Sequence, residues 1–256
     1  MIGTNPVNCR PMRNTVLAIF GLVAAGLPGV LLEGALATPA AAHPRAAHAP
    51  AVVVELFTSQ GCSSCVKSGD VIEAAAEKPH VIALTFAVDY WDYLGWEDTF
   101  AKSEFTERQR AYMKRFALRD VYTPQMVVDG QAQAAALHAD TMQDMVKAAE
   151  RVRRHPPALA LTKDRLEIAD GEAPRGGADV WLVRYDPKSQ SVLVKKGENR
   201  GKTIVAQNVV KQLARLGGWA GKAKVLHLPA ADTDGLKTVI LVQGAHGGPI
   251  LGAREF

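Results

Sequence analysis

A Cys-X-X-Cys motif, Cys62–Cys65, constrains the fold of this 256-residue chain more than any other feature. It follows the apolar run Val52–Phe57, which is typical of a buried strand, and the polar turn Thr58–Gly61. Two intervening residues let both sulfurs sit in the first turn of one helix, with the first thiol at its positive end. This arrangement is typical of a redox-active dithiol, although zinc sites use the same spacing.

The amino terminus has the pattern of a secretory signal peptide. Arg10 and Arg13 precede the apolar stretch Val16–Leu27, and small-residue sites end at Ala37 and Ala42. The apolar stretch is shorter than the roughly 20 residues that span a bilayer. We therefore expect cleavage after Ala37 or Ala42 rather than an uncleaved membrane anchor.

Export would simplify the cysteine content of the mature protein. We predict a signal peptide over residues 1–42 and a flexible leader over residues 43–50, so that Cys9 is removed and the protein is periplasmic or secreted. Cys62 and Cys65 then remain in an oxidising compartment, with no membrane span after cleavage. Two cysteines three positions apart close too small a loop to add much stability, which favours redox chemistry over a structural disulfide.

The first half of the chain alternates strands and helices. A helix is expected from Ser63 to about Glu77, ended by Pro79, and a second buried strand over Val81–Val88. Strand, helix and strand in close succession form a βαβ unit with parallel strands. The further elements expected are a helix that ends near Leu118, a strand over residues 121–130, a short strand over 132–137 and a helix that ends at Arg153.

The second half, beyond Pro157, has short strands separated by turns. One stretch with helical spacing, Val209–Leu216, interrupts them. We expect an α/β fold, with a first domain over residues 51–156 and a small β-rich, sandwich-like domain over residues 157–256. The expected strands of the second domain lie at residues 159–162, 165–169, 179–185, 191–195, 223–228 and 238–243.

The dithiol needs a thiolate that attacks and a second thiol that resolves the mixed disulfide. We assign the attack to Cys62, at the helix start and nearer solvent, and the resolution to Cys65, one turn further on and more buried. Glu55 interrupts the buried apolar run before the motif. It is a candidate catalytic proton carrier for the resolving thiol, or a strand-end residue turned towards solvent.

Thr123 and Pro124 are the candidate substrate-binding residues. A proline at the mouth of a core strand removes a ladder hydrogen bond, which indicates another use. A cis bond there would leave the backbone of Thr123 free to pair with a bound peptide beside Cys62. The aromatic segment Asp89–Trp96, with Trp91 as a further candidate contact, either shapes this groove or packs as an insertion.

Composition gives other function classes little support. Lys and Arg number 30 against 26 for Asp and Glu, and no basic block exceeds a pair, which argues against nucleic-acid binding. Zinc would need two further ligands at motif spacing, and the histidines are scattered. Alternatives are Cu(I) held by the two thiolates, or non-catalytic protein binding. We expect no cofactor and no resident metal, with protein thiols or disulfides as partners, and the oligomeric state is left open.

Several long motifs resemble one bacterial family. They are the segments Val53–Cys65, Asp89–Trp96, Phe105–Tyr112, Val121–Gly130 and Trp181–Tyr185. Together they resemble the secreted thioredoxin-like proteins catalogued as domain of unknown function 1223, from about residue 51 to the C-terminus. The resemblance implies a thioredoxin-like domain followed by a small β domain, and it implies no defined reaction.

The chain departs from that family directly after the motif. Members are expected to carry Pro-Pro-Ala-Asp there, where this sequence has Val66–Asp70. The change removes prolines that start a helix, places the cation of Lys67 near both sulfurs, and puts Gly69 where it should weaken the helix. We nevertheless predict an exported thiol–disulfide oxidoreductase-like protein.

Overall fold

The computed structural model describes residues 50–152, 154–230 and 235–256, which lie in one compact unit. The expected signal peptide and all but the last residue of the expected leader lie outside the described residues. The strands are β1 (Val52–Thr58), β2 (Val81–Ala87), β3 (Gln125–Val128), β4 (Ala132–Ala135), β5 (Leu159–Thr162), β6 (Arg165–Ile168), β7 (Ala178–Asp186), β8 (Gln190–Leu193), β9 (Thr203–Ala206), β10 (Val209–Trp219), β11 (Lys224–His227), β12 (Lys237–Gly244) and β13 (Ile250–Glu255). The helices are α1 (Ser68–Ala76), α2 (Ser103–Arg115) and α3 (Ala139–Glu150), with the 3₁₀ turns η1 (Ser63–Cys65) and η2 (Asp92–Leu94).

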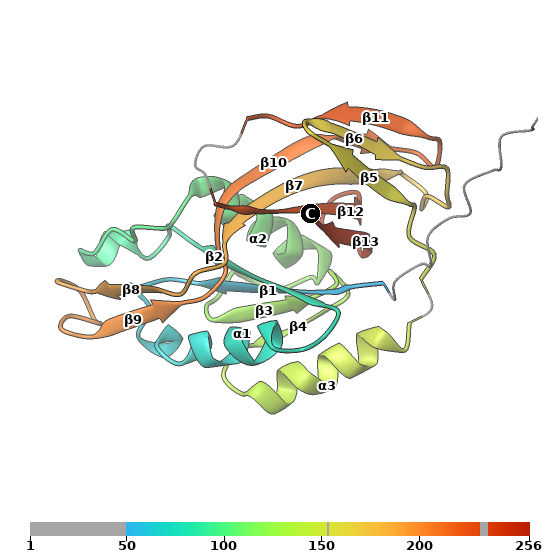
Figure 1. Ribbon diagram of the computed structural model, residues 1–256. Helices are drawn as coiled ribbons and strands as arrows, with labels where there is room; N and C mark the ends of the chain where they lie inside the picture. Colours follow the sequence, from blue (N-terminus) through green and yellow to red (C-terminus); the bar gives the residue numbers. More distant parts are fainter. Residues whose placement is uncertain (1–49, 153, 231–234) are drawn as a thin grey trace, which may run out of the picture. The chain divides into compact units, whose positions relative to one another are not determined.

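A mixed sheet organises the fold (Figure 1). Within the described residues it has eight strands, in the order β13-β12-β7-β10-β2-β1-β3-β4. β1 and β2 are parallel and α1 connects them, as the sequence predicts for a βαβ unit. β3 lies antiparallel to β1, and β4 antiparallel to β3. The class is therefore α/β with one large mixed sheet and few helices.

The second half of the chain joins this sheet through β10. The junction is parallel, with Val209 opposite Thr85 of β2. The neighbouring Asn208 extends it: the backbone N–H of Thr85 donates to the Asn208 carbonyl at 3.0 Å, and Asn208 Nδ2 donates to the Ala83 carbonyl at 2.9 Å. The strands after residue 157 thus continue the sheet of the first half. The domain division expected at that point stays a prediction.

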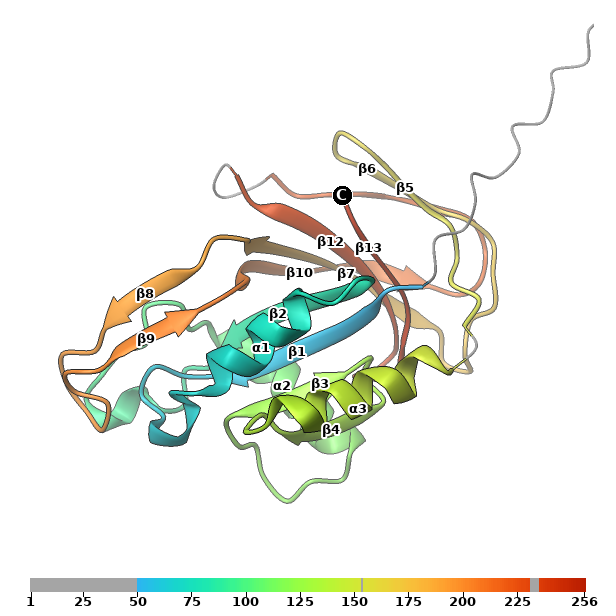
Figure 2. The same cartoon turned by 60° about the horizontal axis from the view of Figure 1, so that its bottom comes forward.

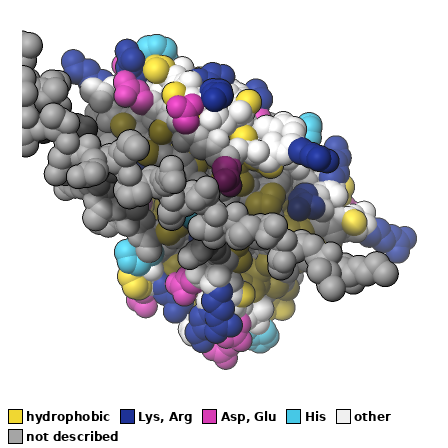
Figure 3. Space-filling view, turned by 90° about the vertical axis from the view of Figure 1, so that its right-hand side faces the viewer, with side chains coloured by type: hydrophobic (Ala, Val, Ile, Leu, Met, Phe, Trp, Pro, Cys, Tyr) yellow, Lys and Arg dark blue, Asp and Glu magenta, His cyan; other side chains and the backbone are white. Residues whose placement is uncertain are grey.

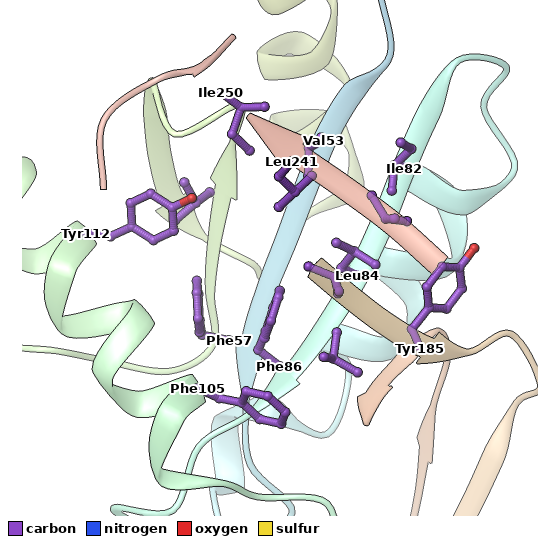
Figure 4. Packing of buried hydrophobic residues seen from close by; sticks show 14 of the residues in the cluster. Val53, Phe57, Ile82, Leu84, Phe86, Phe105, Tyr112, Tyr185, Leu241 and Ile250 are labelled. Carbon is purple, nitrogen blue, oxygen red and sulfur yellow. The ribbon is translucent and has the colours of Figure 1, made fainter. Parts of the chain in front are cut away.

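Both faces of the first half of the sheet are covered, which explains why β1 is almost continuously apolar. Alternate residues serve opposite faces. Val54 and Leu56 pack with α1 and α3, whereas Val53 and Phe57 face α2. Figure 2 shows α1 and α3 on the near side of the sheet. On the α2 face Phe57 stacks with Phe86 at 5.4 Å between ring centroids, within the cluster that Figure 4 shows. The motif therefore follows a strand that is packed on both sides.

The second half adds another layer. A three-stranded sheet, β11-β6-β5, lies over β7, β10 and β12 (Figure 1). The core between these layers includes Leu166 and Ile168 from β6, Leu182 from β7 and Trp219 from β10. On the face shown in Figure 3, Lys and Arg side chains are interspersed with Asp and Glu. No helix in the described ranges is both long and apolar enough to cross a bilayer.

The helix expected over Val209–Leu216 is wrong, because this stretch belongs to strand β10. β10 pairs with β7 along its length, and bulges follow Val210 and Arg215. Each bulge inserts one residue and shifts the alternation of the strand. Val210 and Leu213, three positions apart, consequently face the same core. In the sequence, apolar residues three positions apart are also the pattern of a helix face, which explains the wrong prediction.

Gly69 has a packing role that the sequence did not indicate. It lies in the first turn of α1, where β9 crosses close to the helix. A Cβ atom at Gly69 would lie 2.8 Å from the backbone carbonyl oxygen of Val205. This position therefore needs glycine for close approach of the β8–β9 hairpin.

We expect Gly69→Ala to lower the free energy of unfolding by up to about 2 kcal/mol. Overpacking against a backbone atom costs about 1–3 kcal/mol, which outweighs the gain of about 1 kcal/mol in helix propensity. Urea denaturation measures the change, and the exposed Glu73→Ala of the same helix is the control, expected within about 0.5 kcal/mol of wild type. A Gly69→Ala protein more stable than wild type would contradict the close packing.

Candidate functional site

Cys62 and Cys65 form a disulfide around the 3₁₀ turn η1. The helix α1 begins only at Ser68, so the expected helix start at Ser63 is wrong. Cys62 has an extended backbone and caps η1, and Cys65 ends this turn. Their side chains are both buried, with 1% and 3% of the residue surface exposed. The expectation that Cys62 lies nearer to solvent is therefore wrong for the disulfide form. In the disulfide form each cysteine therefore presents only a small part of its surface to a partner.

The turn before the motif is held by a buried acid. Asp98 accepts a hydrogen bond from the backbone N–H of Gln60 at 2.7 Å and another from that of Phe100 at 2.9 Å. Burial raises the pKa of Asp98, although these two N–H groups act in the opposite direction. The side chain of Gln60 also accepts a hydrogen bond from Trp96 Nε1 at 2.9 Å. The aromatic segment thus packs against the turn before the motif. A role in shaping a substrate groove stays a prediction.

The predicted substrate-binding residues lie at the disulfide. The Thr123–Pro124 bond is cis. The Ser64 hydroxyl lies 3.3 Å from the Thr123 carbonyl oxygen and 3.2 Å from Cys62 Sγ. Trp91 Nε1 donates to the Thr123 hydroxyl at 2.8 Å. Motif, proline loop and aromatic segment are therefore brought together as predicted from the sequence, whereas their roles stay predictions.

Glu55 is fully buried and points to the face of the sheet that α2 covers. Arg108 Nε donates to Glu55 Oε1 at 2.5 Å, and the Tyr112 hydroxyl donates to Oε2. Burial opposes the charge of Arg108, yet the neighbouring Glu55 carboxylate raises the pKa of the guanidinium. The solvent-facing alternative for Glu55 is therefore wrong. A role as proton carrier stays a prediction for a carboxylate whose two oxygens are already engaged.

Asn199 is a site residue that the sequence did not indicate. It lies in the turn between β8 and β9 and is fully buried. Its Nδ2 donates to the backbone carbonyls of Gln60 at 2.9 Å and Cys62 at 2.8 Å. These contacts span 137 residues or more, so no local pattern could have revealed them. The sequence of residues 197–202 indicated only a polar loop.

Lys67, which the sequence places near the sulfurs, has an exposed side chain. Its effect on a thiolate stays a prediction, because both cysteines are oxidised in this structure. Across the described ranges, no group of three or more His, Cys, Asp or Glu side chains is arranged to hold a metal ion. Beside Cys62 Sγ the described site presents the Ser64 hydroxyl, which also reaches the Thr123 carbonyl oxygen.

Fold and site together define an α/β protein with one large mixed sheet and a Cys-X-X-Cys disulfide beside a cis-proline loop. The chain belongs to the family described as a protein of unknown function (DUF1223), whose model matches residues 53–243. This confirms the resemblance to domain of unknown function 1223, whereas the thioredoxin-like and secreted character stays a prediction. No curated protein matches the chain.

Solved structures show the same architecture. The chain is similar to the crystal structure of protein AGR_C_4864 from Agrobacterium tumefaciens, with 30% identity and a TM-score of 0.66, over 82% of this chain and 96% of that chain. HBP35 of Porphyromonas gingivalis shares the fold at 14% identity and a TM-score of 0.52, over 83% of this chain and 76% of that chain. These likenesses support the fold and name no reaction.

We expect Arg108→Met to lower the free energy of unfolding by about 3–5 kcal/mol, because it leaves the Glu55 carboxylate buried without its cation. Arg110→Met is a matched control on the same helix. Arg110 is half exposed and pairs with the exposed Glu107 at 3.5 Å, so its loss should cost under about 1 kcal/mol. Urea denaturation of both variants measures the two changes in the free energy of unfolding. Equal costs would contradict a central role for the Glu55–Arg108 pair.

Proposed function

We propose that this protein is an exported thiol–disulfide oxidoreductase-like protein whose first domain, residues 51–156, is thioredoxin-like. Its substrates would be protein thiols or disulfides. The observation that carries the proposal is the position of Ser64, whose hydroxyl lies within 3.3 Å of both Cys62 Sγ and the Thr123 carbonyl. A reacting sulfur and a backbone edge suited to an extended peptide thereby share one small site.

The exchange balances with the two cysteines alone. A partner thiolate attacks Cys62 Sγ, the Cys62–Cys65 bond breaks, and Cys65 leaves as a thiolate. A second partner thiolate then attacks the partner sulfur of the mixed disulfide and releases Cys62 as a thiolate. Two electrons have passed from the partner to the protein, and the partner holds a new disulfide. The reverse sequence reduces a partner disulfide, and the relative reduction potentials set the direction.

Ser64 would serve both chemical states of Cys62. In the disulfide neither sulfur carries a proton, so the single hydroxyl proton of Ser64 is available to Cys62 Sγ or to the Thr123 carbonyl. A Cys62 thiolate would be a charged acceptor, and hydrogen bonds to charged acceptors are stronger than those to neutral ones. On reduction the Ser64 hydroxyl would donate its hydrogen bond to Cys62 Sγ. The Thr123 carbonyl would then be free to accept a hydrogen bond from an N–H group of a bound peptide.

The short 3₁₀ turn adds to the same effect. Cys62 caps η1, and the backbone N–H groups that open such a turn favour a nearby anion. The exposed cation of Lys67 would act in the same direction at longer range. The basic start and apolar stretch of the amino terminus support export to the periplasm or beyond the cell, where such exchange is possible.

A second candidate is a non-catalytic, protein-binding member of the same fold. The observation that favours it is the burial of both sulfurs, at 1% and 3% exposure, since catalytic cysteines are ordinarily accessible to their partners. A carrier of Cu(I) would likewise need both thiolates in their reduced form. The oxidoreductase would act on many substrate molecules in turn, whereas the binding protein would catalyse no exchange.

Reduction of insulin by dithiothreitol tests the proposal. We expect the wild-type protein, without its first 42 residues, to accelerate the precipitation of insulin chains. Cys62→Ser should fall to the rate of dithiothreitol alone, because the attacking sulfur is lost.

Two other outcomes would count against the mechanism. Full activity in Cys62→Ser would overturn the assignment of the nucleophile. A wild-type rate equal to that of dithiothreitol alone would favour the binding protein instead.

A further inference from the structure

The tip of the β8–β9 hairpin is built into the cysteine loop. Asn199 is buried, and both protons of its amide are used, one on the Gln60 carbonyl and one on the Cys62 carbonyl. Its Oδ1 accepts a hydrogen bond from Lys202 Nζ at 3.0 Å. The side chain thus has a fixed orientation, with donors towards the motif and acceptor towards a cation.

The hairpin is itself held at two places beside the motif. At its tip, a Cβ at Gly197 would come within 3.4 Å of the Leu94 carbonyl oxygen, which shows how closely the turn packs on the aromatic segment. Further along, the backbone of Val205 lies against Gly69 of α1. Figure 2 shows the hairpin beside the segment that leads into α1. Asn199 therefore lies on a hairpin that is itself packed against the aromatic segment and α1.

We propose that Asn199 positions Cys62 for thiol–disulfide exchange, by holding the Cys62 peptide so that its carbonyl dipole does not oppose the thiolate. The carbonyl belongs to the residue that carries the attacking sulfur, and its oxygen bears partial negative charge. Two donors neutralise part of that charge, Asn199 Nδ2 at 2.8 Å and the backbone N–H of Cys65 at 3.1 Å. The Lys202 ammonium polarises the Asn199 amide in the same sense.

This inference rests on the proposed role of Cys62 as the attacking thiol, and its readout needs no turnover. The probe is iodoacetamide, and the observable is the pH dependence of alkylation of Cys62 in the Cys65→Ala protein, which has a single thiol once the first 42 residues are removed. Because only the thiolate reacts, the midpoint of the profile reports the pKa of Cys62.

We expect Asn199→Ala to move this midpoint upward by about half a pH unit, a thiolate population about threefold smaller on the rising limb of the profile. Asn199→Asp should move it further, by about one unit, because a carboxylate adds negative charge and offers no donor. If the aspartate variant fails to fold, the alanine variant carries the test.

The matched control is Asn208→Asp. Asn208 is also buried, lies in the same half of the chain, and donates to a backbone carbonyl at 2.9 Å, that of Ala83 in β2. We expect its midpoint to equal that of the Cys65→Ala parent. Unchanged midpoints in both Asn199 variants, or an equal shift in Asn208→Asp, would overturn the positioning role. An absence of insulin reduction alongside a shifted midpoint would refute the proposed function and retain only the effect of Asn199 on the Cys62 thiolate.

Discussion

The buried ion pair between Glu55 and Arg108 is the constraint on which the arrangement of the elements depends. A carboxylate inside a strand covered on both faces is costly unless it is paired. Arg108 supplies the charge from α2, and its guanidinium lies within 5.6 Å of the ring centroids of Phe86, Tyr112 and Trp181. The ion pair thereby joins α2 to β1.

The same network reaches the second half of the chain. Tyr112 lies one turn after Arg108, and its hydroxyl accepts a hydrogen bond from Gln243 Nε2 of β12 at 2.9 Å. The next residue after Arg108, Gln109, donates to the Tyr122 carbonyl at 2.8 Å, just before the cis-proline loop. α2 therefore holds the strand that leads into the cysteines and the loop that lies beside them.

Much of this site could be predicted from the sequence, because its parts are local. The apolar run, the turn, the Cys-X-X-Cys motif and the proline at the mouth of a strand are each legible within a few residues. The partner of Glu55 lies 53 residues away, and the Asn199 contacts span more than twice that distance. Bulges in β10 also replaced the alternation of a strand with a helical spacing. Long-range pairing and bulges were therefore the features that sequence patterns missed.

Gly69, in the segment that follows the motif, also has a physical role in the site. Gly69 lets β9 approach α1, and the hairpin that β9 belongs to carries Asn199 to the Cys62 carbonyl. The sequence of this segment predicts a weakened helix. In the folded protein the segment packs against the hairpin whose Asn199 supports the cysteine loop. Catalytic competence of the dithiol would then depend on both halves of the chain.

Trapping of mixed disulfides tests the central claim most directly. In Cys65→Ala, a thiolate at Cys62 can attack a partner disulfide and has no resolving thiol to release it. Incubation of this variant with native, disulfide-bonded insulin, followed by mass spectrometry without a reductant, should give a covalent adduct at Cys62. The adduct should disappear on reduction and be absent from the Cys62→Ala, Cys65→Ala double variant. No adduct on a folded Cys65→Ala protein would contradict the account.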